Sequence, residues 1–317
     1  MADLFTVVTD KAVLDASQIE GWQQGAILQS QARSRFLPGT PLIDPSNLIT
    51  GNLSVGTFIK FSNNAASTTA LTDGEEITST ALVDSEINLT LAEYGHDITV
   101  TAMGQNSSGA RAFIGAAGVV GNNLAKTVDT LAIKALEASS NETIVTQSAE
   151  SSLTASDILT PSYVNQARTS LVKRGVDPMF GDLYVALAHP DVIYDLKNST
   201  NANAWSQVAK YSPDDTVLRS QMEIFGGFLW IESPFVSVNA DAGSIAVDTY
   251  HTAFFGARAL GMAMSSQFPI RTYQNDVHSK VPGRFTSIGW NGIFTFGIVD
   301  SDAVQLVTSA SSIGANS

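Results

Sequence analysis

Cysteine is absent from this chain of 317 residues, so disulfide bridges and thiolate metal sites are excluded. Histidine is scarce, and none of the four residues has the H-E-x-x-H spacing of a zinc site. Basic residues are few as well: 17 Lys and Arg stand against 30 Asp and Glu, a net charge of −13. This balance argues against a protein that grips nucleic acid by neutralising its phosphates.

Long hydrophobic runs are also missing. The longest apolar stretches, such as residues 293–299, fall well short of the ~20 residues that a membrane-spanning helix needs. The first ten residues lack the basic start and apolar run of a secretion signal. At 44% hydrophobic residues, the composition is that of a globular protein with one large or two ordinary domains. We therefore expect no membrane partner.

The most informative segment covers residues 53–93, which alternate in the manner of strands. Its apolar positions are Leu53, Val55, Ile59 and Phe61 on the way out, and Ile87, Leu89 and Leu91 on the way back. A polar tip that includes Glu75 and Glu76 separates the two halves, and the whole segment holds one lysine, Lys60, against six acidic residues. An isolated two-stranded hairpin is marginally stable in water. The segment therefore predicts an extended hairpin that gains its order from a neighbour.

The first fifty residues have the composition of an arm. Apolar spacing over residues 10–33 is compatible with a helix. Pro38, Pro41 and Pro45 then follow closely, which favours an extended crossing segment. Segments of this kind are commonly either disordered or docked on another surface.

The strongest helical pattern runs from about residue 108 to about residue 138. Its apolar positions recur every three or four residues, at Phe113, Ala117, Val120, Leu124, Val128, Leu131 and Ala135. At ~1.5 Å per residue, thirty residues would span ~45 Å. We predict that this helix is the spine of the subunit.

The remainder predicts an α/β region over residues 156–262 and a set of closing strands. A helix is expected from Pro161 to Gly175, with the Thr160 hydroxyl as its N-cap, and a second is expected from Pro190. Buried strands are expected at 183–187, 228–231 and 253–255. Closing strands are expected at 268–273, 285–290, 293–299 and 304–307.

The sequence contains few motifs that could carry out chemistry. Gly115, Gly118 and Gly121 have the wrong spacing for a dinucleotide-binding turn and lie inside a predicted helix. Ser170 and Lys173 match the S-x-x-K pattern of serine acyl-transferases, but the companion S-D-N and K-T-G elements are absent. The sequence nominates no catalytic, cofactor-binding or metal-binding residues, and we expect no enzyme.

The order of these segments resembles the major capsid (coat) protein of tailed double-stranded DNA bacteriophages, which has the Hong Kong phage coat fold. The stretches that carry the resemblance are residues 32–36, 56–61, 94–95, 183–191, 255–259, 284–290 and 298–300. The resemblance covers nearly the whole chain. It implies an α+β fold with an N-terminal arm, an extended β-hairpin loop, a long spine helix, a peripheral domain with antiparallel strands and an α/β axial domain.

The resemblance also implies boundaries for these parts. The arm would occupy residues 1–50 and the extended loop residues 51–95. The peripheral domain with the spine helix would combine residues 96–155 with 263–317, and the axial domain would cover 156–262. The arm and the loop would cross neighbouring subunits, which agrees with the argument that neither can bury itself.

The implied function is that of a structural subunit that assembles as hexamers and pentamers into an icosahedral phage head. Such a shell encloses double-stranded DNA without sequence-specific binding, belongs to the virion and is assembled in the host cytoplasm. The resemblance implies a portal as a partner and is compatible with a decoration protein. Only about fifty residues precede the extended loop, so a separate scaffolding protein is expected. Because neither an acceptor asparagine nor a catalytic acid can be named for Lys60, we do not expect autocatalytic crosslinking.

The residues expected at contacts between subunits come from the end of the arm and from the hairpin. They are Arg33, Arg35, Phe36, Leu53, Val55, Ile59, Lys60, Phe61, Glu75, Glu76, Ile87 and Leu89. Two alternative functions stay open at this point. One is the shell of an encapsulin-like compartment, and the other is a soluble serine acyl-transfer enzyme that uses Ser170 and Lys173.

Overall fold

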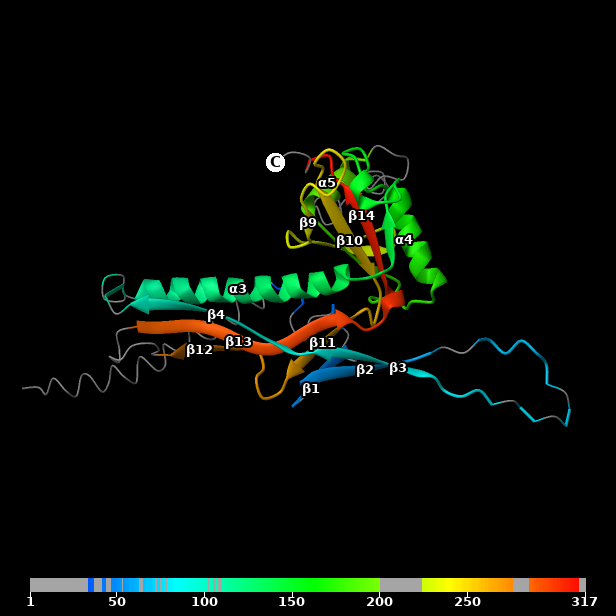
Figure 1. Ribbon diagram of the computed structural model, residues 1–317, viewed down its shortest axis with the longest axis horizontal. Coiled ribbons are helices and arrows are strands. Elements are labelled where there is room, and N and C mark those ends of the chain that lie inside the picture. Colours follow the sequence, from blue (N-terminus) through cyan, green and yellow to red (C-terminus); the bar gives the residue numbers. More distant parts are fainter. Residues whose placement is uncertain are drawn as a thin grey trace, which may run out of the picture.

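A computed structural model gives the fold, which combines two sheets, one long helix and a projecting hairpin (Figure 1). The residues that the structure describes are 34–36, 42–43, 47–52, 54–62, 65–71, 73–74, 76–77, 79–101, 103–104, 107, 110–199, 224–275 and 285–313. The helix predicted over residues 10–33 lies outside this set. The mixture of antiparallel sheets with few helices confirms the predicted α+β class.

The first sheet has five strands and is built around β13 (Phe285–Ile298). That strand pairs antiparallel with β4 (Ala92–Thr101), β11 (Leu260–Ser265) and β12 (Arg271–Asn275), and β1 (Leu48–Gly51) adds to β11 in parallel. Helix α3 (Ala110–Glu137) runs along β4 and β13 (Figure 1). One face of this sheet is therefore covered by the helix.

Helix α3 confirms the predicted spine. Val120, Leu124 and Val128 are buried, as the apolar spacing requires, and Leu131 and Ala135 pack at the edge of the core. The pattern underestimated the buried face, because Ile133 and Leu136 are also almost fully buried. The helix packs on the first sheet along its length and contacts β10 as well, so more than one stripe is covered.

The second sheet has seven strands, and two helices accompany it. Its path is β5 (Glu142–Ile144), β14 (Val304–Ala310), β10 (Thr249–Phe255), β6 (Tyr184–Ala188), β8 (Phe228–Glu232) and β7 (Ile224–Phe225), and β9 (Val238–Asn239) pairs with β10. The helices are α4 (Pro161–Lys173) and α5 (Pro190–Asn198), and two short 3₁₀ turns are η2 (Glu150–Ser152) and η4 (Ser301–Ala303). The described part of the chain contains no helix apolar and long enough to cross a membrane.

Two local expectations differ from the structure. The Thr160 side chain makes no capping hydrogen bond, although Pro161 does begin α4. The strands expected at 285–290 and 293–299 form one continuous strand, β13, that runs through Asn291 and Gly292. Gly292 serves close packing rather than a turn, because a Cβ there would lie 2.9 Å from the Cα of Ile270.

The last strand belongs with the middle of the chain. The sequence boundaries group residues 263–317 with the first sheet, but β14 pairs with β10 and β5 in the second. All seven residues of β14 are buried. The connection from β13 to β14 therefore carries the chain from one sheet to the other.

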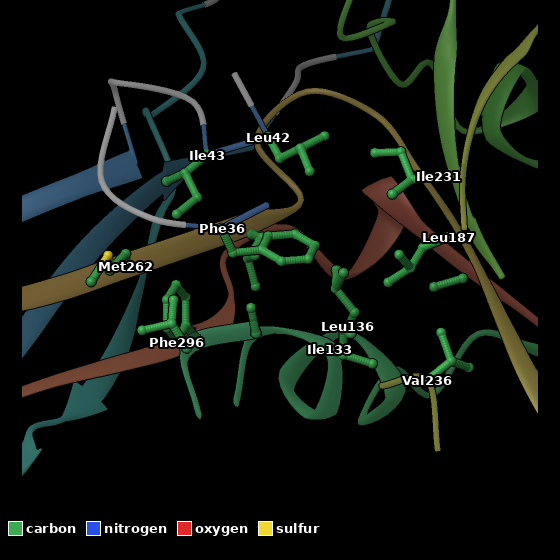
Figure 2. Close-up of a cluster of buried hydrophobic side chains, with 14 of the residues drawn as sticks. Phe36, Leu42, Ile43, Ile133, Leu136, Leu187, Ile231, Val236, Met262 and Phe296 are labelled. Atoms are coloured by element: carbon green, nitrogen blue, oxygen red, sulfur yellow. The ribbon is translucent and has the colours of Figure 1, made fainter. Parts of the chain in front are cut away.

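The main core lies where α3 meets both sheets (Figure 2). Phe36 occupies the middle of this cluster and is 0% exposed, with Leu42 and Ile43 beside it from the same N-terminal part of the chain. Ile133 and Leu136 approach from α3. A second cluster fills the space between α4, α5 and the seven-stranded sheet, and a third lies under the hairpin.

Candidate assembly surfaces

The projecting hairpin consists of β2 (Val55–Phe61) and β3 (Asp84–Thr90), which pair with each other and with no other described strand. It extends well beyond the rest of the subunit (Figure 1). The ladder continues one step past the strands, because Ser62 N donates to Val83 O at 2.9 Å. At the other end, Leu91 N donates to Ser54 O at 3.0 Å, and from Ala92 onward the chain belongs to the five-stranded sheet. The predicted extended hairpin is confirmed in its position and pairing.

The register of the hairpin divides its apolar residues between two faces. Ile59 lies opposite Glu86 and Phe61 opposite Asp84, whereas Ile87 lies opposite Phe58. Directly opposed residues share a face of an antiparallel pair, and neighbours in a strand point to opposite faces. Val55, Ile59 and Phe61 therefore lie on one face, while Ile87 and Leu89 lie on the other. The two alternating runs in the sequence do not form a single apolar surface.

The inner face of the hairpin root packs on its own subunit. Phe58 is 5% exposed and contacts Ala263 and Val299, and Ile87 and Leu89 are partly buried around them. Glycines permit this approach, since a Cβ at Gly297 would overlap the side chain of Leu89. The hairpin thus gains part of its order within the chain, which corrects the expectation that all of it comes from a neighbour.

The outer face is exposed. Ile59 and Phe61 are 56% and 57% exposed, although both are large apolar side chains. Beyond the paired strands, further apolar residues are exposed at Leu71, Ile77, Leu82 and Val83. Acidic side chains accompany them on β3, at Asp84 and Glu86. Clustered exposed apolar side chains of this kind are typical of interaction sites.

Lys60 points to the inner side and forms an ion pair there. Its Nζ lies 2.6 Å from Asp300 Oδ1 and 3.2 Å from Asp302 Oδ2. Burial alone would lower the pKa of Lys60, but the hydrogen bonds and charges of the two aspartates outweigh it, so the pKa is raised. The hairpin is thereby tied to the turn between β13 and β14.

That turn receives two further side chains from distant segments. Asn141, which follows α3, donates to Ser301 O at 2.6 Å. Arg174, at the end of α4, donates to Asp302 O at 2.7 Å and to Val304 O at 3.0 Å. The turn between β13 and β14 is therefore where the hairpin, the end of α3 and the end of α4 meet, at the passage from the first sheet to the second.

Residues 34–36 are fixed to the middle of α3 by a buried carboxylate. Asp129 is 2% exposed, and its Oδ1 accepts from Ser34 Oγ at 2.6 Å, from Arg35 N at 2.9 Å and from Phe36 N at 3.2 Å. Burial raises the pKa of Asp129, and these hydrogen bonds oppose the rise without cancelling it. The arm therefore enters the subunit at a defined point.

The remaining expected contact residues fall into three groups. Arg33, Leu53 and Glu75 lie outside the described residues. Arg35 and Glu76 are exposed. Phe36 fills the core of its own chain, so its side chain offers no surface to a neighbour, and Phe58 was overlooked in the sequence although it holds the hairpin root.

The described residues include no cluster of three or more acidic or histidine side chains placed to bind a metal ion. Ser170 is half-buried and Lys173 is exposed near the end of α4, and the backbone carbonyl of Ser170 accepts from Arg174 N at 3.3 Å. No hydrogen bond joins the side chains of Ser170 and Lys173 in this part of the chain. The S-x-x-K alternative receives no support from this geometry.

The long helix along a sheet, the second sheet and the hairpin together define the class of coat subunits that build phage heads. The capsid of Ralstonia phage GP4 matches with a TM-score of 0.66 and 13% identity over 88% of this chain and 90% of its own. The capsid of cyanophage Pam1 matches with a TM-score of 0.62 and 16% identity over 89% and 93%. The head of Helicobacter pylori bacteriophage KHP40 matches with a TM-score of 0.61 and 10% identity over 83% and 88%.

These likenesses establish the fold, and the family follows from the sequence itself. Residues 108–290 match the family model described as phage capsid protein, which covers more than half of the chain. The chain belongs to this family and is a structural subunit of a phage capsid. No curated protein matches it. The compartment and enzyme alternatives are not favoured.

Proposed function

We propose that copies of this chain assemble as hexamers and pentamers into an icosahedral head, and that the hairpin of one subunit lies over the next. The observation that carries the proposal is the exposed outer face of the hairpin, with Ile59 and Phe61 each more than half exposed. Large apolar side chains of a projecting hairpin are exposed to water, and covering them with another surface lowers the free energy. Ring-closing contacts between unlike surfaces would supply that cover.

The two sheets would serve different places in the shell. The five-stranded sheet with α3 would form the peripheral domain, and the seven-stranded sheet with α4 and α5 would form the axial domain around the symmetry axes. In this assignment β5 and β14 join the axial domain, since they pair in its sheet. Residues 51–95 would be the extended loop and residues 1–50 the arm.

The contents and helpers of the shell are part of the same proposal. Double-stranded DNA would be enclosed without sequence-specific binding, because a net charge of −13 gives the wall weak repulsion for phosphates. A separate scaffolding protein and a portal would act during assembly in the host cytoplasm. A decoration protein could bind the finished surface.

Shortening the hairpin tests the proposal. Residues 63–82 would be replaced by Asn-Gly, which closes a two-residue turn between the hydrogen-bonded pair Ser62 and Val83. We expect a folded subunit that fails to form stable shells in electron microscopy. Normal shells from the shortened chain would contradict the role of the hairpin.

A pair of point variants separates surface chemistry from hairpin length. Ile59→Ser with Phe61→Ser should weaken assembly, because the outer face loses its apolar area. The matched control, Ile59→Val with Phe61→Tyr, keeps most of that area and should assemble. Equal assembly by both variants would show that this face is not buried in the shell.

A further inference from the structure

The ion pair of Lys60 with Asp300 and Asp302 connects the hairpin to the turn between β13 and β14. The hairpin has its own two-stranded sheet, and the backbone pairing of that sheet ends at the root with the hydrogen bond from Leu91 N to Ser54 O. No backbone hydrogen bond of β2 or β3 reaches either large sheet within the described residues. The hairpin is thus a separate body attached at its root.

Packing holds the root but not the part beyond it. Phe58 is enclosed by Ala263, Val299 and the close backbone of Gly261. Two positions further along β2, on the same face as Phe58, comes Lys60, and there the hairpin faces a cavity of about 390 Å³. The cavity is lined by Lys60 and Ile87 from the hairpin, Ser139 and Ser140 after α3, and Val299 and Ser301 from the β13–β14 connection. The space leaves room for movement where close packing has ended.

At the edge of this cavity, the Lys60 side chain connects β2 to Asp300 and Asp302. Among the described residues, it makes the only side-chain hydrogen bonds between the hairpin and the rest of the chain. The link ends on the turn that Asn141 and Arg174 also hold, so its far end is fixed. An angle set by Lys60 is therefore set relative to both sheets.

The ion pair between Lys60 and the two aspartates is weak enough to open. The side chain of Lys60 is 34% exposed, and those of Asp300 and Asp302 are 25% and 56% exposed. Ion pairs with this much access to water add little net stability and are screened by salt. Contacts made by a neighbouring subunit could outweigh it.

We propose that the pairing of Lys60 with Asp300 and Asp302 is a releasable latch that fixes the hairpin angle in the free subunit. When closed, it holds the hairpin against the β13–β14 turn. When open, it allows the part of the hairpin beyond Phe58 to pivot toward the surface that it covers, while the packed root stays in place. The inference rests on the proposed shell function, because a neighbouring copy is what would replace the latch.

Distance measurements between spin labels test the latch in the full-length unassembled chain. The absence of cysteine allows labels to be placed only at Asp84→Cys on β3 and Gln166→Cys on α4, both exposed positions. We expect one narrow distance population with Lys60 in place. Lys60→Gln should add a second population that is absent from the parent, and high salt should produce the same change in the parent.

Two controls make the outcome decisive. Lys60→Arg keeps the charge and should retain the narrow population, and Lys173→Gln removes an exposed lysine at the end of α4 and should also retain it. If Lys60→Gln gives the parent's distribution in a folded chain, the latch is wrong. Shell formation is scored separately by electron microscopy. A latch that opens in a chain that never forms shells would overturn the proposed function and leave the hinge standing.

Discussion

Ser34 Oγ donates to Asp129 Oδ1 at 2.6 Å across a separation of 95 positions in the sequence. The same carboxylate accepts from the backbone of Arg35 and Phe36, while the ring of Phe36 is buried in the core. The N-terminal segment and the spine helix are thus parts of one packed unit. An arm that reaches a neighbour would start from this fixed point.

Asp129→Ala should lower the free energy of unfolding by at least ~2 kcal/mol, because it leaves several buried donors without an acceptor. Asp129→Asn should cost less, since the amide oxygen can still accept. Ser34→Ala removes the bond that the hydroxyl donates to Asp129 and the longer one that it accepts from Phe36 N, and it should cost ~1 kcal/mol because Phe36 N keeps Asp129 as an acceptor. Urea unfolding measures the three variants, and amide exchange at Arg35 and Phe36 reports local release. An alanine variant as stable as the parent would rule out this role for Asp129.

Two glycines should respond in opposite directions to the same added methyl group. Gly297→Ala forces a Cβ into the side chain of Leu89 at the hairpin root and should cost ~1–3 kcal/mol. Gly115→Ala, at an exposed position of α3 with no atom near the added Cβ, should stabilise the chain by up to ~1 kcal/mol. Thermal unfolding of both variants gives the comparison. A stabilising Gly297→Ala would mean that the root is loosely packed.

Leu124 lies at the centre of the buried face of the spine helix, and Leu131 lies at the edge of that face. Leu124 is 2% exposed, so Leu124→Ala should cost ~2–5 kcal/mol. Leu131 is only partly buried against the same cluster, and its replacement by alanine should cost less. The denaturant midpoints of the two variants test the order, and the reverse order would contradict the placement of α3.

The lowered pKa of Glu150 predicts that the folded chain loses stability in acid. Burial alone would raise the pKa of Glu150, but hydrogen bonds from Thr249, Asn239 and His251 outweigh burial and lower the pKa below 4.5. The unfolded chain then takes up the proton at a higher pH than the folded chain. The contribution of Glu150 is therefore present above about pH 4.5 and is lost as the pH falls through the lower folded pKa.

Urea unfolding at a series of pH values measures this contribution. Glu150→Gln should be less stable than the parent at neutral pH, and the two curves should approach each other in acid. Glu142→Gln is a useful comparison, because Glu142 also accepts a hydroxyl bond, from Thr308. Parallel curves for Glu150→Gln and the parent would exclude Glu150 as a source of the acid dependence.

Elements with a strong local period could be predicted from the sequence. Helix α3 follows from its apolar repeat, and the strands at residues 184–188 and 228–232 follow from short apolar runs. The hairpin could be placed because its two alternating runs flank a polar tip. In each case the signal lies within a few consecutive residues.

Pairing between distant segments could not be predicted in the same way. The inward face of β2 is chosen by Phe58 and by the glycines that it meets, and glycine gives no hydrophobic signal. Alternation grouped Val55, Ile59 and Phe61 on one face, but it gave no sign that Phe58 holds the opposite face against its own subunit. The sheet to which β14 belongs depends on β10 and β5, which lie far from it in the chain. The Lys60 ion pair likewise joins residues 240 positions apart.

The position of β14 has a consequence for folding. It lies between β5 and β10 in the interior of the seven-stranded sheet, and among the described strands β5 pairs with β14 alone. The short strand that follows the spine helix therefore reaches this sheet only through β14. Formation of this part of the sheet depends on pairing between segments far apart in the chain, and such pairing is slow and leaves strand edges open while it is incomplete.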